Sequence, residues 1–246
     1  MQIKLVFEKK YVIKNRYCYY SWDISKIPHL ALAGSTGLGK TYLETLIIGR
    51  ICKQMSDSEV TICDFKGDEA FLPLKNTSNK TKRIYFFEDC EEGFINFHNS
   101  FLERQKRTDL SRNIKLLVFD EWSGFLHFLE KKKAEEYKKK MFNLLMLGRS
   151  LNIHILLSFQ RLDSEFFTSG SRDQLGLTII LGNPSKEVKK MLFNNCEEHL
   201  FENKSRGEGY LIINGMEIRD IIVPEYSNHD KVLEYINKGI TNGILM

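Results

Sequence analysis

Short apolar runs alternate with longer amphipathic segments along most of this chain. The runs that predict strands are Leu30–Ala33, Val60–Cys63, Ile84–Phe87, Leu116–Phe119, Ile153–Leu157 and Thr178–Leu181. Apolar positions at helical spacing, or strong helix formers, predict helices between them at Thr41–Met55, Glu91–Lys106 and Ala134–Leu151. Fully apolar strands that alternate with helices indicate an α/β fold with a mainly parallel sheet, covered by helices on both faces.

Both ends of the chain depart from this alternation. Three short strands are expected near the N-terminus, at Ile3–Phe7, Tyr11–Ile13 and Tyr17–Trp22. Near the C-terminus, Tyr210–Ile213 and Ile218–Val223 flank Asn214-Gly215, a dipeptide that favours a two-residue β-hairpin turn. We therefore expect a β-rich extension at residues 1–26, a core at 27–224 and a helical tail at 225–246.

Length and composition fit one globular domain. The chain has 246 residues, of which 42% are hydrophobic and 28% charged, and this excludes disordered and fibrous proteins. No apolar run approaches the ~18 residues of a membrane span, and the N-terminus lacks the features of a signal peptide, so we expect a cytoplasmic protein. The five cysteines include no C-x-x-C pair, which argues against a zinc site and favours buried thiols. A net charge of +4 permits an anionic partner.

The most informative motif lies between the first core strand and the first long helix. It reads Gly34-Ser35-Thr36-Gly37-Leu38-Gly39-Lys40-Thr41, which is a complete G-x-x-x-x-G-K-T phosphate loop (Walker A). Glycines allow backbone N–H groups to approach phosphate oxygens closely, and the positive end of the following helix adds to the site. Lys40 is expected to reach the β- and γ-phosphates of ATP, and the Thr41 hydroxyl to ligate Mg²⁺.

A second motif (Walker B) closes the strand Leu116–Phe119 with two acids, Asp120 and Glu121. A buried strand rarely ends in adjacent carboxylates unless the site uses them. In a phosphate-loop enzyme, the first acid supports Mg²⁺ and the second is placed to orient the attacking water. We therefore expect Asp120 at the metal and Glu121 as the catalytic base.

Two more strands bring polar groups to the same edge of the predicted sheet. Val60–Cys63 is followed by Asp64, and Ile153–Leu157 runs into Ser158-Phe159-Gln160-Arg161. Ligands of open α/β sheets bind at the carboxyl ends of the strands, so these groups should converge on the nucleotide. Gln160 is a candidate for sensing the γ-phosphate or aligning the water.

Several motifs in register resemble the FtsK/SpoIIIE branch of the FtsK–HerA motor ATPases, which have a RecA-like P-loop fold. The similar segments are residues 23–34, Ile62–Gly67, Asp120-Glu121, Leu147–Arg161 and Arg206–Leu211, so the resemblance covers residues 23 to 224. Phe65 departs from the family pattern, which has a proline at this position, and Trp122 follows the acidic pair. The chain carries no visible membrane anchor, long linker or winged-helix DNA reader, so it resembles the motor domain alone.

The resemblance implies an ATP-driven double-stranded DNA translocase, or a coupling ATPase of plasmid transfer, that works as a ring, most simply a hexamer. A membrane-anchored or relaxosome partner would then supply anchoring and loading. The resemblance also implies an arginine finger from the neighbouring subunit, for which Arg149 and Arg172 are both candidates. A viral genome-packaging ATPase and a non-motor ATP-binding adaptor remain alternatives. No L-S-G-G-Q signature of a transporter ATPase is present.

Two weaker patterns leave their meaning open. Lysine triplets at Lys131–Lys133 and Lys138–Lys140 repeat on one face of a predicted helix, where they either track DNA phosphates or form a solvated face. The aromatic residues of Tyr17–Trp22 either pack on an adenine base or belong to the core.

Overall fold

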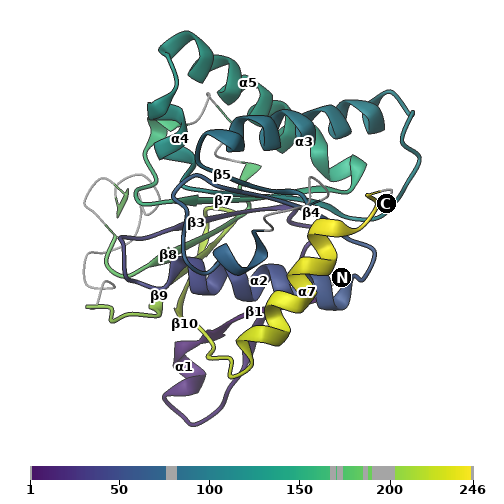
Figure 1. Ribbon diagram of the computed structural model, residues 1–246. Helices are drawn as coiled ribbons and strands as arrows, with labels where there is room; N and C mark the ends of the chain where they lie inside the picture. Colours follow the sequence, from purple (N-terminus) through teal and green to yellow (C-terminus); the bar gives the residue numbers. More distant parts are fainter. Residues whose placement is uncertain are drawn as a thin grey trace.

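The computed structural model describes residues 2–75, 82–166, 170, 174–184, 188–189 and 203–244. A ten-stranded sheet forms its centre, with the strand order β2-β1-β10-β9-β8-β3-β7-β6-β4-β5 (Figure 1). The strands are β1 Gln2–Glu8, β2 Tyr19–Asp23, β3 His29–Ala33, β4 Glu59–Asp64, β5 Ile84–Phe86, β6 Lys115–Asp120, β7 Ile153–Phe159, β8 Leu177–Leu181, β9 Glu208–Ile213 and β10 Glu217–Ile222. The helices are α1 Lys9–Val12, α2 Lys40–Gln54, α3 Cys90–Gln105, α4 Trp122–Phe128, α5 Lys131–Leu147 and α7 His229–Thr241.

The sheet has a parallel part and an antiparallel part. The strands from β8 through β3, β7, β6 and β4 to β5 pair in parallel. The strands β9, β10, β1 and β2 continue the sheet in antiparallel pairs. The expected α/β fold with a mainly parallel sheet is confirmed, and the first 23 residues extend this sheet at its antiparallel edge.

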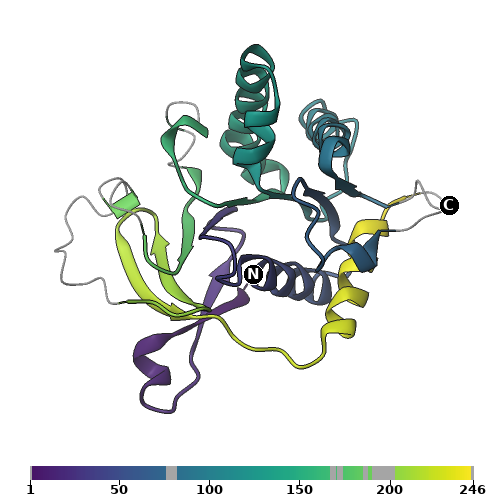
Figure 2. The same ribbon diagram turned by 60° about the vertical axis from the view of Figure 1, so that its left-hand side comes forward.

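Helices cover both faces of the parallel part. Helices α2 and α7 lie side by side on one face, and α3, α4 and α5 lie on the other (Figures 1 and 2). The core is accordingly divided by the sheet, because successive strand residues point to opposite faces. In β6, for example, Leu116 and Val118 face α2, whereas Leu117 and Phe119 face the aromatic residues of α3 and α4.

The C-terminal hairpin forms as predicted. Asn214 and Gly215 have positive φ values of 51° and 67°, as a primed turn requires. Because Ile213 pairs with Glu217, three residues connect β9 to β10 and not the expected two. The predicted strand Tyr11–Ile13 is wrong, because the chain there forms the short helix α1 and Ile13 donates its N–H to the carbonyl of Lys9. The β propensity of residues 11–13 does not decide their structure, because this segment connects two antiparallel strands and forms a local turn.

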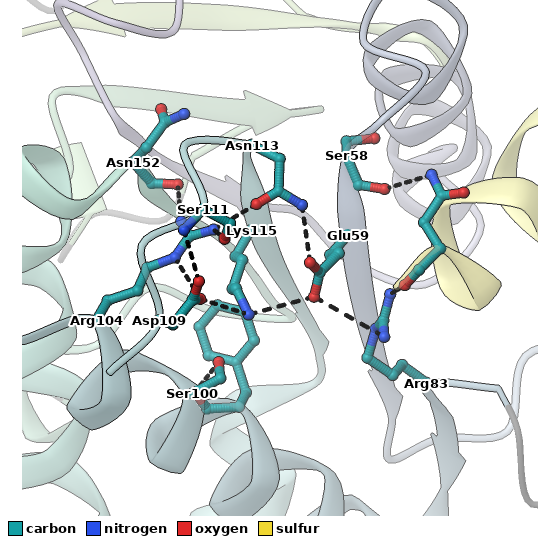
Figure 3. Close-up of polar contacts among 12 residues, drawn as sticks. Ser58, Glu59, Arg83, Ser100, Arg104, Asp109, Ser111, Asn113, Lys115 and Asn152 are labelled. Carbon is teal, nitrogen blue, oxygen red and sulfur yellow. Dashed lines mark hydrogen bonds and ion pairs between the residues drawn. The ribbon is translucent and has the colours of Figure 1, made fainter. Parts of the chain in front are cut away.

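A buried polar cluster ties the amino ends of the parallel strands together (Figure 3). Arg104, at the end of α3, is 4% exposed, and its guanidinium donates to Asp109, to the backbone carbonyls of residues 151 and 152, and to Ser111 and Asn113. Lys115 of β6 bridges Asp109 and Glu59 at 3.2 and 3.3 Å. A cavity of about 530 Å³ beside Arg104 therefore lies at the edge of the sheet that faces away from the phosphate loop.

Candidate nucleotide-binding site

The phosphate loop lies between β3 and α2 as predicted. Gly37 and Gly39 have φ values of 85° and 95°, a region that side chains disfavour, although a Cβ atom on either would meet nothing within 4 Å. Glycine is therefore required here for backbone conformation and not for space. The loop is exposed at residues 35–37, and its free N–H groups lie at the amino end of a 15-residue helix, where an anion is favoured. Lys40, the first residue of that helix, is 8% exposed.

Acids end two neighbouring parallel strands beside this loop. Asp64 ends β4 and Asp120 ends β6, and the two residues are partners in the register of the sheet. Asp64 is fully buried and accepts hydrogen bonds from the backbone N–H groups of Gly67 and Asp68 at 2.8 and 2.7 Å. Asp120 is 2% exposed. The strand-end geometry that the sequence predicted thus brings both carboxyl groups to the phosphate-loop edge.

Burial and mutual repulsion raise the pKa of both acids. Burial raises the pKa of Asp64 to about 7, and the neighbouring Asp120 adds to the rise. Burial likewise raises the pKa of Asp120, with Glu121 and Asp68 adding to it and with Ser158 and Lys40 opposing it. Ionised carboxylates in a low-dielectric site favour a nearby cation. The site therefore places carboxyl groups whose ionised form a bound cation would stabilise beside a lysine and a phosphate-binding helix end.

Glu121 occupies a conformation that is uncommon for a residue with a side chain. Its φ of 60° and ψ of 50° lie in the left-handed region, directly before the first residue of α4. Residues held in such regions cluster at functional sites, where the surrounding structure compensates for the strain. The Ser123 hydroxyl donates to Glu121 Oε1 at 2.7 Å, so one carboxylate oxygen is already fixed in place.

Asp68 is a site residue that the sequence analysis missed. Its Oδ2 accepts a hydrogen bond from Thr41 Oγ1 at 3.0 Å, so the hydroxyl expected to ligate Mg²⁺ already has a carboxylate partner. Asp68 directly follows the family-like segment Asp64–Gly67, and this position was the available signal. The contact itself depends on the loop after β4 folding over the start of α2.

This donor set fits Mg²⁺. No group of three His, Cys, Asp or Glu side chains forms a complete metal site among the described residues. Mg²⁺ is typically bound by one or two carboxylates together with water and substrate phosphates, and not by an all-protein cage. Thr41, with Asp68 and Asp120 behind it, offers the hard oxygen donors that such a shared site needs.

Glu44 is a second acid that the sequence did not single out. It lies one turn into α2, is fully buried, and neither carboxyl oxygen has a hydrogen-bond partner within the described part of the chain. Burial raises the pKa of Glu44 well above 4.5, with Asp120 and Asp64 adding to the rise. Glu44 therefore lies within electrostatic range of the same group of carboxylates.

The remaining predicted site residues lie in different places. Gln160 follows β7 at the phosphate-loop edge and is exposed, next to Phe159, whose carbonyl accepts from the N–H of Gly34 at 3.3 Å. Arg149 lies at the opposite edge, before β7, where its Nε donates to the carbonyl of Ser25 at 3.3 Å. Arg149 is thus remote from the phosphate loop of its own chain. Arg172 lies outside the described residues.

A cavity of about 280 Å³ opens beside the phosphate loop. Its lining combines Lys40, Thr41 and Asp68 with residues from the end of the chain, notably Arg206, Tyr226 and His229. The segment after β10 therefore closes one side of the site, and sequence analysis had assigned no site residue there.

The two weaker sequence patterns have separate outcomes. The aromatic residues Tyr17–Trp22 are not at the phosphate loop: Trp22 is buried and donates to the carbonyl of Ile27, and Tyr19 packs against Phe7. On α5, half of the lysines are ion-paired, namely Lys133 with Glu91, Lys138 with Glu135 and Lys140 with Glu136.

The cysteines conform only partly to expectation. Cys52, Cys63 and Cys90 are buried free thiols, but Cys18 is exposed because it precedes β2 at the sheet edge. Cys196 lies outside the described residues. Among the described residues, no helix is long and apolar enough to cross a membrane.

Comparison with known proteins gives one curated relative and many similar structures. No family model matches the chain. The FtsK domain-containing protein YdcQ of Bacillus subtilis (strain 168) is 30% identical over 210 residues, which are 78% of this chain and 42% of YdcQ. The cytoplasmic domain of the type VII secretion ATPase EccC of Thermomonospora curvata superposes with a TM-score of 0.71 at 18% identity, over 98% of this chain and 31% of that one. The pCW3 conjugation coupling protein TcpA, a monomer form with ATPγS, gives a TM-score of 0.70 at 15% identity, over 95% and 69%.

These relationships agree with the site geometry. The chain spans less than half the length of YdcQ, so the similarity concerns a part of that relative and not the whole of it. The structural likeness is at low sequence identity and supports the fold, while YdcQ links that fold to a named family. With its phosphate loop and strand-end acids in place, the chain is an FtsK-like P-loop ATPase domain of the FtsK–HerA group.

Proposed function

We propose that this chain is the motor domain of an ATP-driven double-stranded DNA translocase or coupling ATPase that works as a ring, most simply a hexamer. The observation that carries the proposal is that Asp120, which ends β6 in register with Asp64 of β4, lies within electrostatic range of Lys40 in the phosphate loop. A passive ATP-binding adaptor has no need of Glu121 in a strained conformation beside that loop.

Each site residue has a defined task in this proposal. Lys40 and the loop N–H groups hold the phosphates, and Thr41, Asp68 and Asp120 hold Mg²⁺, which neutralises charge on the phosphates when bound. Glu121, fixed by Ser123, has its other oxygen available to orient the attacking water. Gln160 lies at the same edge and senses the γ-phosphate.

The position of Arg149 supports the ring. Arg149 is at the sheet edge opposite its own phosphate loop, so it can serve only the site of a neighbouring subunit. Head-to-tail contacts close into rings when the rotation between subunits permits. Arg172 stays the second candidate for this finger.

DNA as the cargo is supported by charge and by one of the relatives. The chain has a net charge of +4, and TcpA is named as a conjugation coupling protein. EccC, with a similar fold, is named as a secretion ATPase, so the likeness of fold does not decide between DNA and polypeptide cargo. The discriminating measurement is the ATPase rate with linear duplex DNA and, separately, with an unfolded polypeptide.

The same experiment tests where DNA binds. Duplex DNA should stimulate ATP hydrolysis, with an affinity that falls by a log–log salt slope of about −0.9 for each phosphate contact. Replacing Lys131, Lys132 and Lys139 by glutamine should make that slope shallower if α5 tracks phosphates. The matched control replaces the ion-paired Lys133, Lys138 and Lys140 instead. Stimulation by polypeptide but not by DNA would reject the translocase.

A further inference from the structure

The cavity beside the phosphate loop has a second wall that is aromatic. Three rings form this wall. Tyr42 lies in the first turn of α2, Tyr226 in the segment that connects β10 to α7, and His229 at the start of α7. The loop fixes where the phosphates of a nucleotide sit, so its sugar and base must extend away from Lys40 and Thr41. The aromatic wall borders the same cavity and is therefore available to them.

The three rings are held against one another by stacking and hydrogen bonds. Tyr42 and Tyr226 stack with centroids 4.4 Å apart and planes inclined by 24°, and Tyr226 and His229 lie nearly parallel, 5.8 Å apart. The Tyr226 hydroxyl and His229 Nδ1 are 3.1 Å apart, and the Tyr226 N–H donates to the Tyr42 hydroxyl at 2.7 Å. Such a group loses little conformational entropy when a flat ligand stacks on it.

Helix packing sets the position of this aromatic group. Helix α7 packs against α2 so closely that a Cβ on Gly49 would lie 2.6 Å from Val232, and one on Gly239 would lie 2.5 Å from the sulfur of Cys52. The Asn228 side chain caps α7 by accepting from the N–H of Lys231 at 2.9 Å, directly before His229. The phosphate loop and the aromatic wall are thereby fixed to one another through α2.

Core packing accounts for Tyr42, which lies against the core cluster, but not for Tyr226 or His229. Tyr226 is only partly buried and His229 is exposed, so their surfaces are not used up by the hydrophobic core. Apolar surface at the rim of a polar cavity is the usual pattern of a ligand site. Every nucleobase presents a π-face, and stacking on an aromatic side chain is sequence-tolerant and favourable.

We propose that Tyr226 and His229, supported by Tyr42, form the stacking surface for the base of the bound nucleotide. This assignment rests on the proposed nucleotide site, and it makes the segment after β10 part of that site. Arg206, which lines the same cavity, adds a cation at its rim; it precedes Gly207, whose N–H donates to the Leu38 carbonyl at 3.2 Å.

The test compares a ligand that has a base with one that lacks it. Titration calorimetry with Mg²⁺ and either ATP or inorganic tripolyphosphate is carried out on the wild type and on Tyr226→Ala and His229→Ala. Loss of one base–aromatic contact should weaken ATP binding by about 5- to 150-fold. Tripolyphosphate binding should stay at the wild-type level, because the loop is unchanged.

Three further variants make the outcomes separable. Tyr226→Phe keeps the ring and should bind ATP nearly as the wild type does. Tyr235→Ala controls for the docking of α7, because Tyr235 lies on this helix, as His229 does, but outside the cavity. Lys40→Ala should weaken both ligands, and if it changes neither, the nucleotide site itself is misplaced. His229 is exposed, so His229→Ala keeps the test valid if Tyr226→Ala fails to fold. Wild-type ATP affinity in both alanine variants, or equal loss of ATP and tripolyphosphate, would overturn the stacking surface while leaving the phosphate loop in place.

Discussion

Replacing Glu44 by glutamine should stabilise the protein, and increasingly so as the pH rises. Glu44 is fully buried on α2, its oxygens have no hydrogen-bond partner within the described chain, and Asp64, Asp68 and Asp120 face it, with Lys40 as the opposing cation. A buried carboxyl without a partner costs about 1–3 kcal/mol even when it is neutral, and glutamine shares most of that cost. The difference between the two side chains therefore arises from ionisation.

The sign follows from the direction of the pKa shift. Burial raises the pKa of Glu44 above its ordinary value of 4.5, so the folded state holds the proton more tightly than the unfolded state does. Protonated Glu44 therefore contributes fully to the free energy of unfolding below pH 4.5. This contribution is lost as the pH rises toward the pKa of Glu44 in the folded state. The free energy of unfolding of the wild type can fall by about 1.4 kcal/mol for each pH unit in this range. Glutamine does not titrate, so Glu44→Gln does not lose stability in this way.

The assay is urea unfolding of both proteins between pH 5 and pH 8 without nucleotide or metal. We expect nearly equal free energies of unfolding at the acid end and a growing advantage for Glu44→Gln toward pH 8. Asp64 and Asp120 titrate in both proteins and largely cancel in the difference. Glu103→Gln, at an exposed position of α3, serves as the control and should show no such trend. A constant difference between wild type and Glu44→Gln across this range would refute the reasoning.

Three further predictions concern single residues. Asp68→Asn should raise the Mg²⁺ concentration for half-maximal ATP hydrolysis by about 10-fold or more, since Asp68 holds the Thr41 hydroxyl; an unchanged Mg²⁺ titration would make Asp68 merely structural. Arg104→Met should lower the free energy of unfolding by about 3–5 kcal/mol, because it removes a buried guanidinium from Asp109 and four other partly buried acceptors; a urea midpoint like that of the wild type contradicts this. Arg149→Ala should cut turnover about a thousandfold with ATP binding retained, and mixing it with Glu121→Gln should restore part of the rate. Full activity of Arg149→Ala would transfer the finger to Arg172.

Local pattern was enough to predict the parallel strands and the polar groups at their ends. The phosphate loop needs glycine for backbone reasons, as the φ values of Gly37 and Gly39 show, so the residue types themselves encode it. Asp120 could be predicted because a parallel strand delivers its carboxyl end to a known edge, and the register with Asp64 agrees.

The missed residues depend on contacts between distant segments. Asp68 and Thr41 are 27 residues apart in the sequence, and Tyr226 and Tyr42 are 184 residues apart. A periodic pattern of residues along the chain therefore cannot predict either contact. Helix α4 was missed because it has only seven residues, so the helical spacing of Trp122, Phe125 and Leu126 extends over too few turns to be recognised.

We propose that this chain hydrolyses ATP with Glu121 as the base. The most direct measurement is phosphate release by the wild type and Glu121→Gln, with ATP binding measured on the same samples and Lys40→Ala as the control for contaminating ATPases. We expect Glu121→Gln to bind ATP as the wild type does and to hydrolyse it about 10²- to 10⁴-fold more slowly. The glutamine amide has the size of the glutamate carboxylate but cannot polarise water. Equal hydrolysis rates for the wild type and Glu121→Gln would contradict it.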